Sequence, residues 1–384
     1  MYPSRSRECL TARTGCDRFG HPDMRVHPNF RIVALLSALL AGCDHSVPFQ
    51  PGAYGPDGPL VPGSIVRLTY NPGQDLIPGW LRDGSGIVYT AERPDRADHD
   101  RCLAFMPVGG GAVSRYACRT TVSDDSLNVF EEAAPGVNGR MAYVRASSTR
   151  GLSRLAPDAQ EFVAAPIDTP AAAQRIFALP FITAWGEAYD AVAAATWLDS
   201  TRLVFVGQHV SYPALCKFCA RDTVKTGVEL AMITFSGDQQ VLTLVPGTTD
   251  ASSVSVGATS DTIYFTRVGD SRVFRYAVSN GQTDTVFDFG ALGIARDVSV
   301  ANGRLAATVG GAVQDSTDAF LGRMQSDHGG NIFVVMLANG ALTQIGNTTW
   351  RFRRPALSPD GTRLIVSALE GSSTAADLWS FDLP

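Results

Sequence analysis

Short apolar runs separated by turn residues recur along the chain from about residue 65 to its end. The clearest copy has a β-rich run at residues 364–366, the turn Ser358-Pro359-Asp360-Gly361 before it, and a further strand-like stretch at 376–382 after a loop. Proline presets φ, aspartate bonds the nearby backbone, and glycine accepts a positive φ. The stretch therefore predicts strand, tight turn, strand, loop and strand.

The same unit recurs five more times upstream. The six predicted units occupy residues 80–118, 133–179, 194–245, 254–289, 298–345 and 356–382. Each of the first five has four predicted strands, and the sixth has three. The strand-like segment 65–70 is left over and supplies the missing strand, which is how a β-propeller avoids an open sheet edge. The pattern predicts an all-β, six-bladed β-propeller of four-stranded antiparallel blades over residues 65–384, with the ring closed by the N-terminal strand.

At Ser358-Pro359-Asp360-Gly361 and Leu378-Trp379 the last unit resembles the TolB-type, WD-like propeller repeat, and the other units keep its pattern without the Ser-Pro pair. A seven-bladed ring or a pair of β-sandwiches is the structural alternative. Every long loop joins a second strand to a third strand, and in a propeller these loops lie on one face. That face is expected to carry the long loops and is called the elaborated face, and the opposite face, which carries the tight turns, is called the trimmed face. Asp360 lies on the trimmed face and is expected to serve the turn.

The N-terminus predicts export. Residues 32–41 form an apolar run too short to span a bilayer, and Arg25 and Arg31 precede it, as in a signal peptide. Leu40-Ala41-Gly42-Cys43 resembles the lipobox of bacterial lipoproteins, which implies lipidation of Cys43; an ordinary signal peptide is the alternative. Residues 1–42 are then a signal region, with Met24 as an alternative start, and 43–64 a lipidated cysteine and a Pro/Gly-rich linker. The expected location is the bacterial cell envelope or periplasm, on either membrane.

Four cysteines follow the linker in two pairs. Cys102 and Cys118 lie symmetrically about Gly110, so a hairpin that turns there predicts a disulfide between them. Cys216 and Cys219 lie in the longest insertion, where a disulfide, a zinc site and a redox pair remain open.

Two acidic loops are candidate ligand sites. The first contains Asp95, Asp98 and Asp100, and the second contains Asp315, Asp318 and His328. If both loops lie on the elaborated face, they are placed to share a cation, for which calcium suits the oxygen ligands. Solvated surface charge is the alternative. No cofactor is expected, with calcium or zinc as the alternatives.

Composition narrows the function. The chain has 384 residues, 45% hydrophobic and 18% charged, and beyond residue 42 it holds 26 basic against 34 acidic residues, which argues against a nucleic-acid partner. Nucleophile-elbow, zinc-protease and phosphate-loop motifs are missing, so the chain is expected not to be an enzyme. The sequence favours a monomeric lipoprotein scaffold for another envelope protein. The alternative is a propeller that binds or cleaves glycans through its acidic loops.

Overall fold

The computed structural model describes the chain in segments, all of which belong to the second of its two compact units, residues 1–48 and 49–384. The described residues are 65–70, 73–92, 101–108, 113–118, 126–137, 139–149, 159–179, 181–182, 187–211, 224–237, 239–310, 313–318, 322–327, 330–345, 350–370 and 375–384. They form antiparallel β-sheets with two short 3₁₀ turns, η2 (Pro170–Ala172) and η3 (Gly290–Leu292). The predicted all-β class is confirmed. No helix in these segments is long and apolar enough to cross a membrane.

The first two strand groups follow the predicted units. They comprise β2 (Asp75–Trp80), β3 (Gly86–Glu92), β4 (Arg101–Pro107) and β5 (Arg115–Ala117), then β6 (Ser126–Pro135), β7 (Arg140–Thr149), β8 (Ala159–Pro166) and β9 (Gln174–Leu179). A single parallel bridge between Arg101 and Val129 joins the groups into one sheet. Within each group, neighbouring strands pair antiparallel.

Three further sheets follow in chain order. The third holds β10 (Phe181–Ile182), β11 (Glu187–Trp197), β12 (Arg202–Ser211), β13 (Val224–Ser236) and β14 (Gln239–Leu244). The fourth holds β15 (Ala251–Val256), β16 (Thr262–Arg267), β17 (Arg272–Ala277) and β18 (Gln282–Asp288). The fifth holds β19 (Ala295–Ala301), β20 (Arg304–Val309), β23 (Asn331–Met336) and β24 (Leu342–Gln344). β10 was not predicted, nor was the separate hairpin of β21 (Val313–Asp318) and β22 (Gly322–Asp327).

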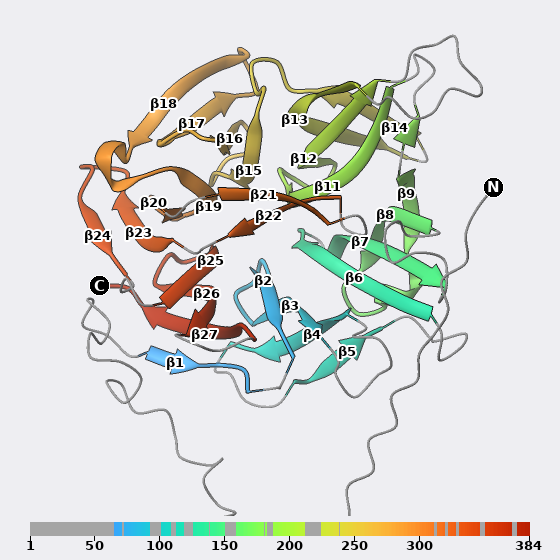
Figure 1. Ribbon diagram of the computed structural model, residues 1–384, viewed down its shortest axis with the longest axis horizontal. Coiled ribbons are helices and arrows are strands. Elements are labelled where there is room, and N and C mark those ends of the chain that lie inside the picture. Colours follow the sequence, from blue (N-terminus) through green and yellow to red (C-terminus); the bar gives the residue numbers. More distant parts are fainter. Residues whose placement is uncertain are drawn as a thin grey trace, which may run out of the picture. The chain divides into compact units, whose positions relative to one another are not determined.

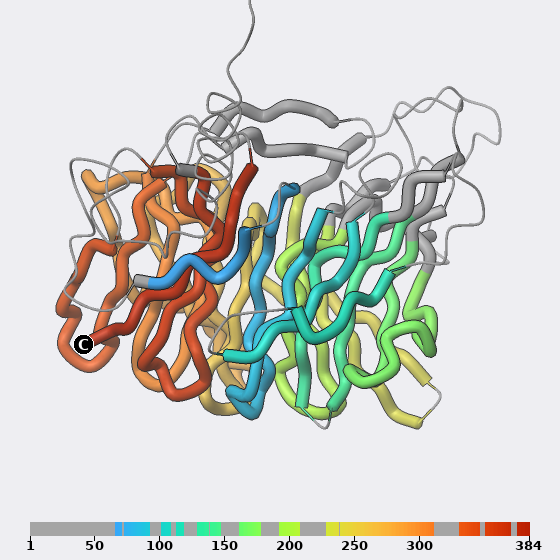
Figure 2. The backbone as a smooth tube through the Cα atoms, turned by 90° about the horizontal axis from the view of Figure 1, so that it is seen from below, coloured from blue at the N-terminus to red at the C-terminus, as the bar shows by residue number. Residues whose placement is uncertain are grey.

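The last sheet joins the two ends of the described chain. It holds β25 (Trp350–Leu357), β26 (Arg363–Glu370) and β27 (Asp377–Asp382), and β1 (Ile65–Arg67) pairs with β27 as predicted. Figures 1 and 2 show β1, in blue, beside the red C-terminal strand. The Arg67 guanidinium lies 2.5 Å from the Asp377 carboxylate, and the Leu378 amide donates to the Thr69 hydroxyl at 2.9 Å. The leftover N-terminal strand therefore supplies the fourth strand of this sheet.

The sheets pack face to face around a common centre (Figure 1), and the apolar core lies between neighbouring sheets. One cluster joins the first sheet to the last, because Trp80 and Tyr89 pack with Ile365 and Leu378. The Trp80 indole also donates to the Ala356 carbonyl at 2.9 Å. Packing therefore connects the N-terminal and C-terminal groups directly.

Tight turns between first and second strands are built from local hydrogen bonds. Asp83, Asp199 and Asp360 each accept a bond from the backbone amide two residues further on, at 3.0, 2.8 and 3.0 Å. Gly361 takes the positive φ, +70°, that the last of these turns requires. The Ser358 hydroxyl and the Thr362 amide hold the pKa of Asp360 below its ordinary value. Asp360 thus serves the turn, as predicted.

Candidate functional site

The first strand of each group lies nearest the centre of the structure (Figure 1). These six strands, β2, β6, β11, β15, β19 and β25, are called the inner strands below. Each inner strand contacts the next one along the chain, and β25 contacts β2. The inner strands are therefore the elements that bring distant parts of the chain together.

Every inner strand has a break in register against its second strand. The breaks fall between Leu76/Gly79, Glu131/Ala134, Ala193/Thr196, Ala251/Ser253, Ala295/Val298 and Arg353/Ala356. Such bulges re-aim side chains and are common beside functional sites. Four of the six bulges hold a non-glycine residue at positive φ, between 48° and 54°: Ile77, Glu132, Ala194 and Arg354. This conformation is costly for such residues and often marks functional sites.

A cavity of about 200 Å³ lies at the level of the bulges and is lined by residues from all six inner strands. Small residues make room for it, among them Gly79, Ala133, Ala195 and Ser253. This central cavity is the feature to which every inner strand contributes.

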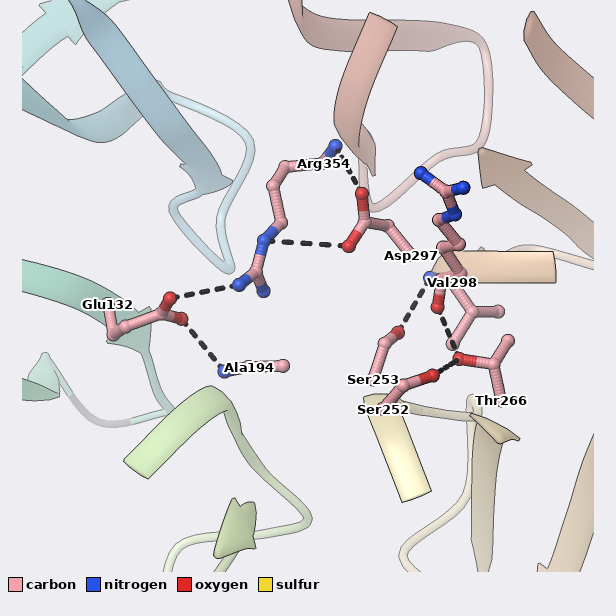
Figure 3. Close-up of polar contacts among 9 residues, drawn as sticks. Glu132, Ala194, Ser252, Ser253, Thr266, Asp297, Val298 and Arg354 are labelled. Atoms are coloured by element: carbon pink, nitrogen blue, oxygen red, sulfur yellow. Dashed lines mark hydrogen bonds and ion pairs between the residues drawn. The ribbon is translucent and has the colours of Figure 1, made fainter. Parts of the chain in front are cut away.

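Glu132 of β6 contributes a carboxylate to the central cavity and is held from two other sheets. Its Oε2 accepts a hydrogen bond from the Ala194 amide of β11 at 2.8 Å, and its Oε1 lies 3.0 Å from Nη2 of Arg354 (Figure 3). The Glu132 side chain is only 10% exposed. Burial of this kind makes a paired charge costly to separate.

Arg354 of β25 bridges two carboxylates. Its backbone amide donates to Oδ2 of Asp297 at 2.9 Å, and its Nε lies 3.5 Å from Oδ1 of the same residue (Figure 3). Its side chain is 27% exposed, against 17% for Asp297. Glu132, Arg354 and Asp297 therefore form one ion-pair network, called the channel network below, although 222 residues separate the first two.

Serine hydroxyls make three further links between described inner strands. Ser253 accepts from the Val298 amide at 2.7 Å, Ser255 from the Val300 amide at 2.9 Å, and Ser299 from the Leu357 amide at 3.0 Å. In the bulge region, Thr266 lies between the Ser252 hydroxyl and the Arg296 carbonyl (Figure 3). Because β19 and β25 are end strands of their sheets, these serine hydroxyls satisfy backbone amides at edges where the ladder has no further strand.

Two further charged groups lie close to the channel network. Arg82 also lines the central cavity and donates to the Trp197 carbonyl at 2.7 Å; burial lowers its pKa. Glu131, next to Glu132, pairs instead with Arg101 at 3.3 Å. Burial raises the pKa of Glu131, and the neighbouring Arg101 opposes that rise.

Few of the sequence-predicted site residues fall where the structure describes side chains. Cys102 and Cys118 do, and they are joined by the expected disulfide, with Cα atoms 4.7 Å apart. Asp315 and Asp318 lie in β21, and their side chains are outside the described part. The remaining predicted site residues lie outside the described residues altogether: Cys43, Asp95, Asp98, Asp100, Cys216, Cys219 and His328. Among side chains that the structure does describe, no three His, Cys, Asp or Glu residues form a group suited to a metal ion.

Sequence reasoning missed the channel network. The predicted inner strands begin inside or after the bulges, at residues such as Ala133 and Ala356, because the extra residue interrupts apolar–polar alternation. One local signal was present: Pro78 and Pro355 stand inside inner strands. Proline inside a strand marks an edge or a bulge.

Comparison with known proteins supports the fold. No family model and no curated protein sequence matches the chain. Among solved structures, a gluconolactonase from Xanthomonas campestris superposes with a TM-score of 0.52 at 12% identity, over 84% of this chain and 90% of its own. TolB from Acinetobacter baumannii superposes at 0.49 and 13% identity, over 80% and 65% of the two chains. An oligogalacturonate lyase with manganese gives 0.43 at 11% identity, over 88% and 97%. The neighbours are β-propeller proteins, so the predicted β-propeller class is confirmed.

The expectation that the chain is not an enzyme is wrong as it was argued. It rested on missing hydrolase, zinc-protease and phosphate-loop motifs, yet the fold is shared with a gluconolactonase. A β-propeller therefore accommodates catalysis, and the absence of those motifs does not exclude it.

Proposed function

We propose that the chain is a membrane-anchored bacterial lipoprotein whose β-propeller binds another protein of the cell envelope at the central cavity. The lipobox-like residues 40–43 and the Pro/Gly-rich linker support the anchor. The pairing of β1 with β27 holds the strand that follows the linker in sequence within the last sheet. Palmitate-analogue labelling tests the anchor: the wild type should incorporate label, and Cys43→Ala should not.

We infer further that the sheets form six blades in a closed ring. The support is the sequence of contacts among the inner strands, which returns from β25 to β2, and the apolar cluster shared by the first and last sheets. In such a ring the inner strands surround an axial channel that opens to a partner.

One observation carries the choice of a protein partner. The central cavity, at about 200 Å³, is smaller than pockets for small molecules, which have volumes of roughly 300–1,000 Å³. A cavity of this size is suited to a single side chain. The channel network adds largely buried charged groups to the cavity. Such groups contribute more to the specificity of an interface than to its affinity.

A glycan-binding or glycan-cleaving propeller is the second candidate. It gains support from the fold shared with a gluconolactonase, and it would use the acidic loops on the elaborated face. The two candidates differ in what the channel network does, since only the first places the partner against it.

In-cell crosslinking of the full chain separates the candidates. We expect one envelope protein to be crosslinked by the wild type and by Asp360→Asn, a turn variant, and to be lost in Glu132→Gln. Saturable binding or turnover of a glycan that Glu132→Gln leaves unchanged, with no crosslinked protein, would overturn the proposal in favour of the second candidate.

A further inference from the structure

We propose that Glu132 and Asp297 form a receptor for one cationic side chain, a lysine or arginine of the partner, and that Arg354 occupies this receptor as a displaceable internal substitute. The inference rests on the proposed protein-binding function and names the chemistry of the group that enters the central cavity.

The two carboxylates are positioned without help from the Arg354 guanidinium. Glu132 is fixed by the Ala194 amide, and Asp297 by the amide of residue 354, at 2.8 and 2.9 Å. Both donors are backbone groups of residues at positive φ in bulges. Since a backbone amide remains in place when a side chain moves, the receptor persists if the guanidinium leaves.

Arg354 is held less firmly at Asp297 than at Glu132. Its Nη2 lies 3.0 Å from Glu132, whereas its Nε lies 3.5 Å from Asp297, longer than a good charge-assisted hydrogen bond of about 2.7–2.9 Å. Its side chain is also the most exposed of the three. A long arginine side chain on a bulge can turn toward solvent without disturbing the backbone bond to Asp297.

The central cavity offers room beside the network for one incoming side chain. Its volume is about 200 Å³. Part of its wall is apolar or small, with Ile77, Pro78 and Ala195 among the lining residues. Such walls suit the aliphatic stem of a lysine or arginine.

Charge selects a cation over an anion. When Arg354 leaves, Oε1 of Glu132 and Oδ1 of Asp297 lose their positive partner while still largely buried. Leaving buried charge unpaired is strongly unfavourable, so the replacement must carry positive charge. An anion bound to Arg354 would draw it from both carboxylates and add a third negative charge. Arg82, at the same cavity, is already bonded to a carbonyl.

Binding of uncharged and charged tripeptides to the purified full chain tests the inference. The probes are Gly-Arg-Gly, Gly-Glu-Gly and Gly-norleucine-Gly, each acetylated at its N-terminus and amidated at its C-terminus so that only the central side chain carries charge, and affinity is measured by calorimetry. We expect saturable binding of Gly-Arg-Gly alone to the wild type. Arg354→Met, which keeps an apolar stem but frees the receptor, should bind it at least tenfold more tightly. Glu132→Gln should weaken binding at least tenfold.

Each other outcome overturns the inference. These are equal binding of Gly-Glu-Gly or Gly-norleucine-Gly, no binding by either the wild type or Arg354→Met, or displacement of Gly-Arg-Gly by calcium chloride at micromolar concentration. Should Arg354→Met not fold, the comparison of wild type with the isosteric Glu132→Gln decides alone. The peptide assay needs no partner protein, so its outcome is independent of the crosslinking test. If a partner is crosslinked but the peptides show no preference for arginine, this inference is wrong and the proposed function is not.

Discussion

The carboxylates of the tight turns make local hydrogen bonds, whereas those of the channel network connect distant parts of the chain. Asp360 in a turn accepts hydrogen bonds from groups within two residues of itself. Glu132 and Asp297 accept them from residues 62 and 57 positions away, and Glu132 pairs with an arginine 222 positions away. The hydrogen bonds of the turn group lie within one hairpin, whereas the network exists only when the sheets are assembled. The difference separates what stabilises one hairpin from what stabilises the arrangement of all the sheets.

Deleting residues 65–70 should have the largest effect, because it removes the longest-range contact in the described chain. Leu68 and Thr69 are buried, and Arg67 pairs with Asp377. We expect a loss on the order of 3 kcal/mol in the free energy of unfolding, from lost apolar burial and hydrogen bonds. Urea unfolding measures it, with a six-residue deletion inside the linker, residues 50–55, as the control. An unchanged unfolding midpoint would show that β1 does not hold the last sheet.

Arg354→Met should come next, with a loss of about 2 kcal/mol, because two largely buried carboxylates lose their partner. Arg275→Met is the matched control. Arg275 pairs with Asp284 at 3.2 Å on the surface, where about half of each side chain is exposed. The control should change stability by less than about 0.5 kcal/mol. Equal losses in the two variants, by urea unfolding, would remove the distinction between the network and a surface ion pair.

Asp360→Ala should cost about 1 kcal/mol, the usual contribution of the hydrogen bonds of one turn. The loss should be confined to the last hairpin. Native-state hydrogen exchange locates it: amides of β25 and β26 near the turn should exchange faster, while those of β6 and β11 should not. Faster exchange across all the inner strands would show that the turn, like the network, stabilises the arrangement of all the sheets.

The remaining prediction concerns pH: the buried carboxylate of Asp377, which pairs with Arg67, and the turn carboxylate of Asp360 should respond with opposite sign. Burial raises the pKa of Asp377 to about 6, against the opposing effect of Arg67, from about 3.9 in an unfolded chain. Its contribution to stability is full below the unfolded value and is lost as pH rises through 6. The pKa of Asp360 is lowered by its hydrogen bonds with Ser358 and Thr362, so its contribution is present above about pH 3.9 and lost on acidification.

Unfolding free energies between pH 3 and 7 check both signs. Asp377→Asn should remove a decline between pH 4 and 7, and Asp360→Asn should remove a decline below pH 4. The same sign in both variants would contradict the assignment of causes.

Much of the fold could be predicted from the sequence because its signals are local. Turn residues such as Asp199 and Gly361 and the apolar runs between them specify hairpins within a few positions. The pairing of β1 with β27 followed from counting strands, since one group was a strand short. The Cys102–Cys118 bridge followed from symmetry about a turn.

The channel network could not be predicted because no local pattern encodes it. Glu132 and Arg354 lie in bulges that break the alternation on which strand prediction depends, and their side chains meet only when distant sheets share a centre. Pro355 marked a bulge, but nothing near it in the sequence pointed to Glu132. The expectation against catalysis failed for a related reason. It relied on the absence of local sequence motifs, whereas the inner strands of this fold bring together residues from the whole chain, and the fold is shared with a gluconolactonase.

A double-mutant cycle between Glu132 and Arg354 tests the central claim most directly, namely that carboxylates and arginine from distant strands act as one site. The free energy of unfolding is measured for the wild type, Glu132→Gln, Arg354→Met and the double variant. We predict a coupling energy of at least about 1 kcal/mol, since residues in one ion-pair network are not additive. Effects that add to within about 0.3–0.5 kcal/mol would contradict the account.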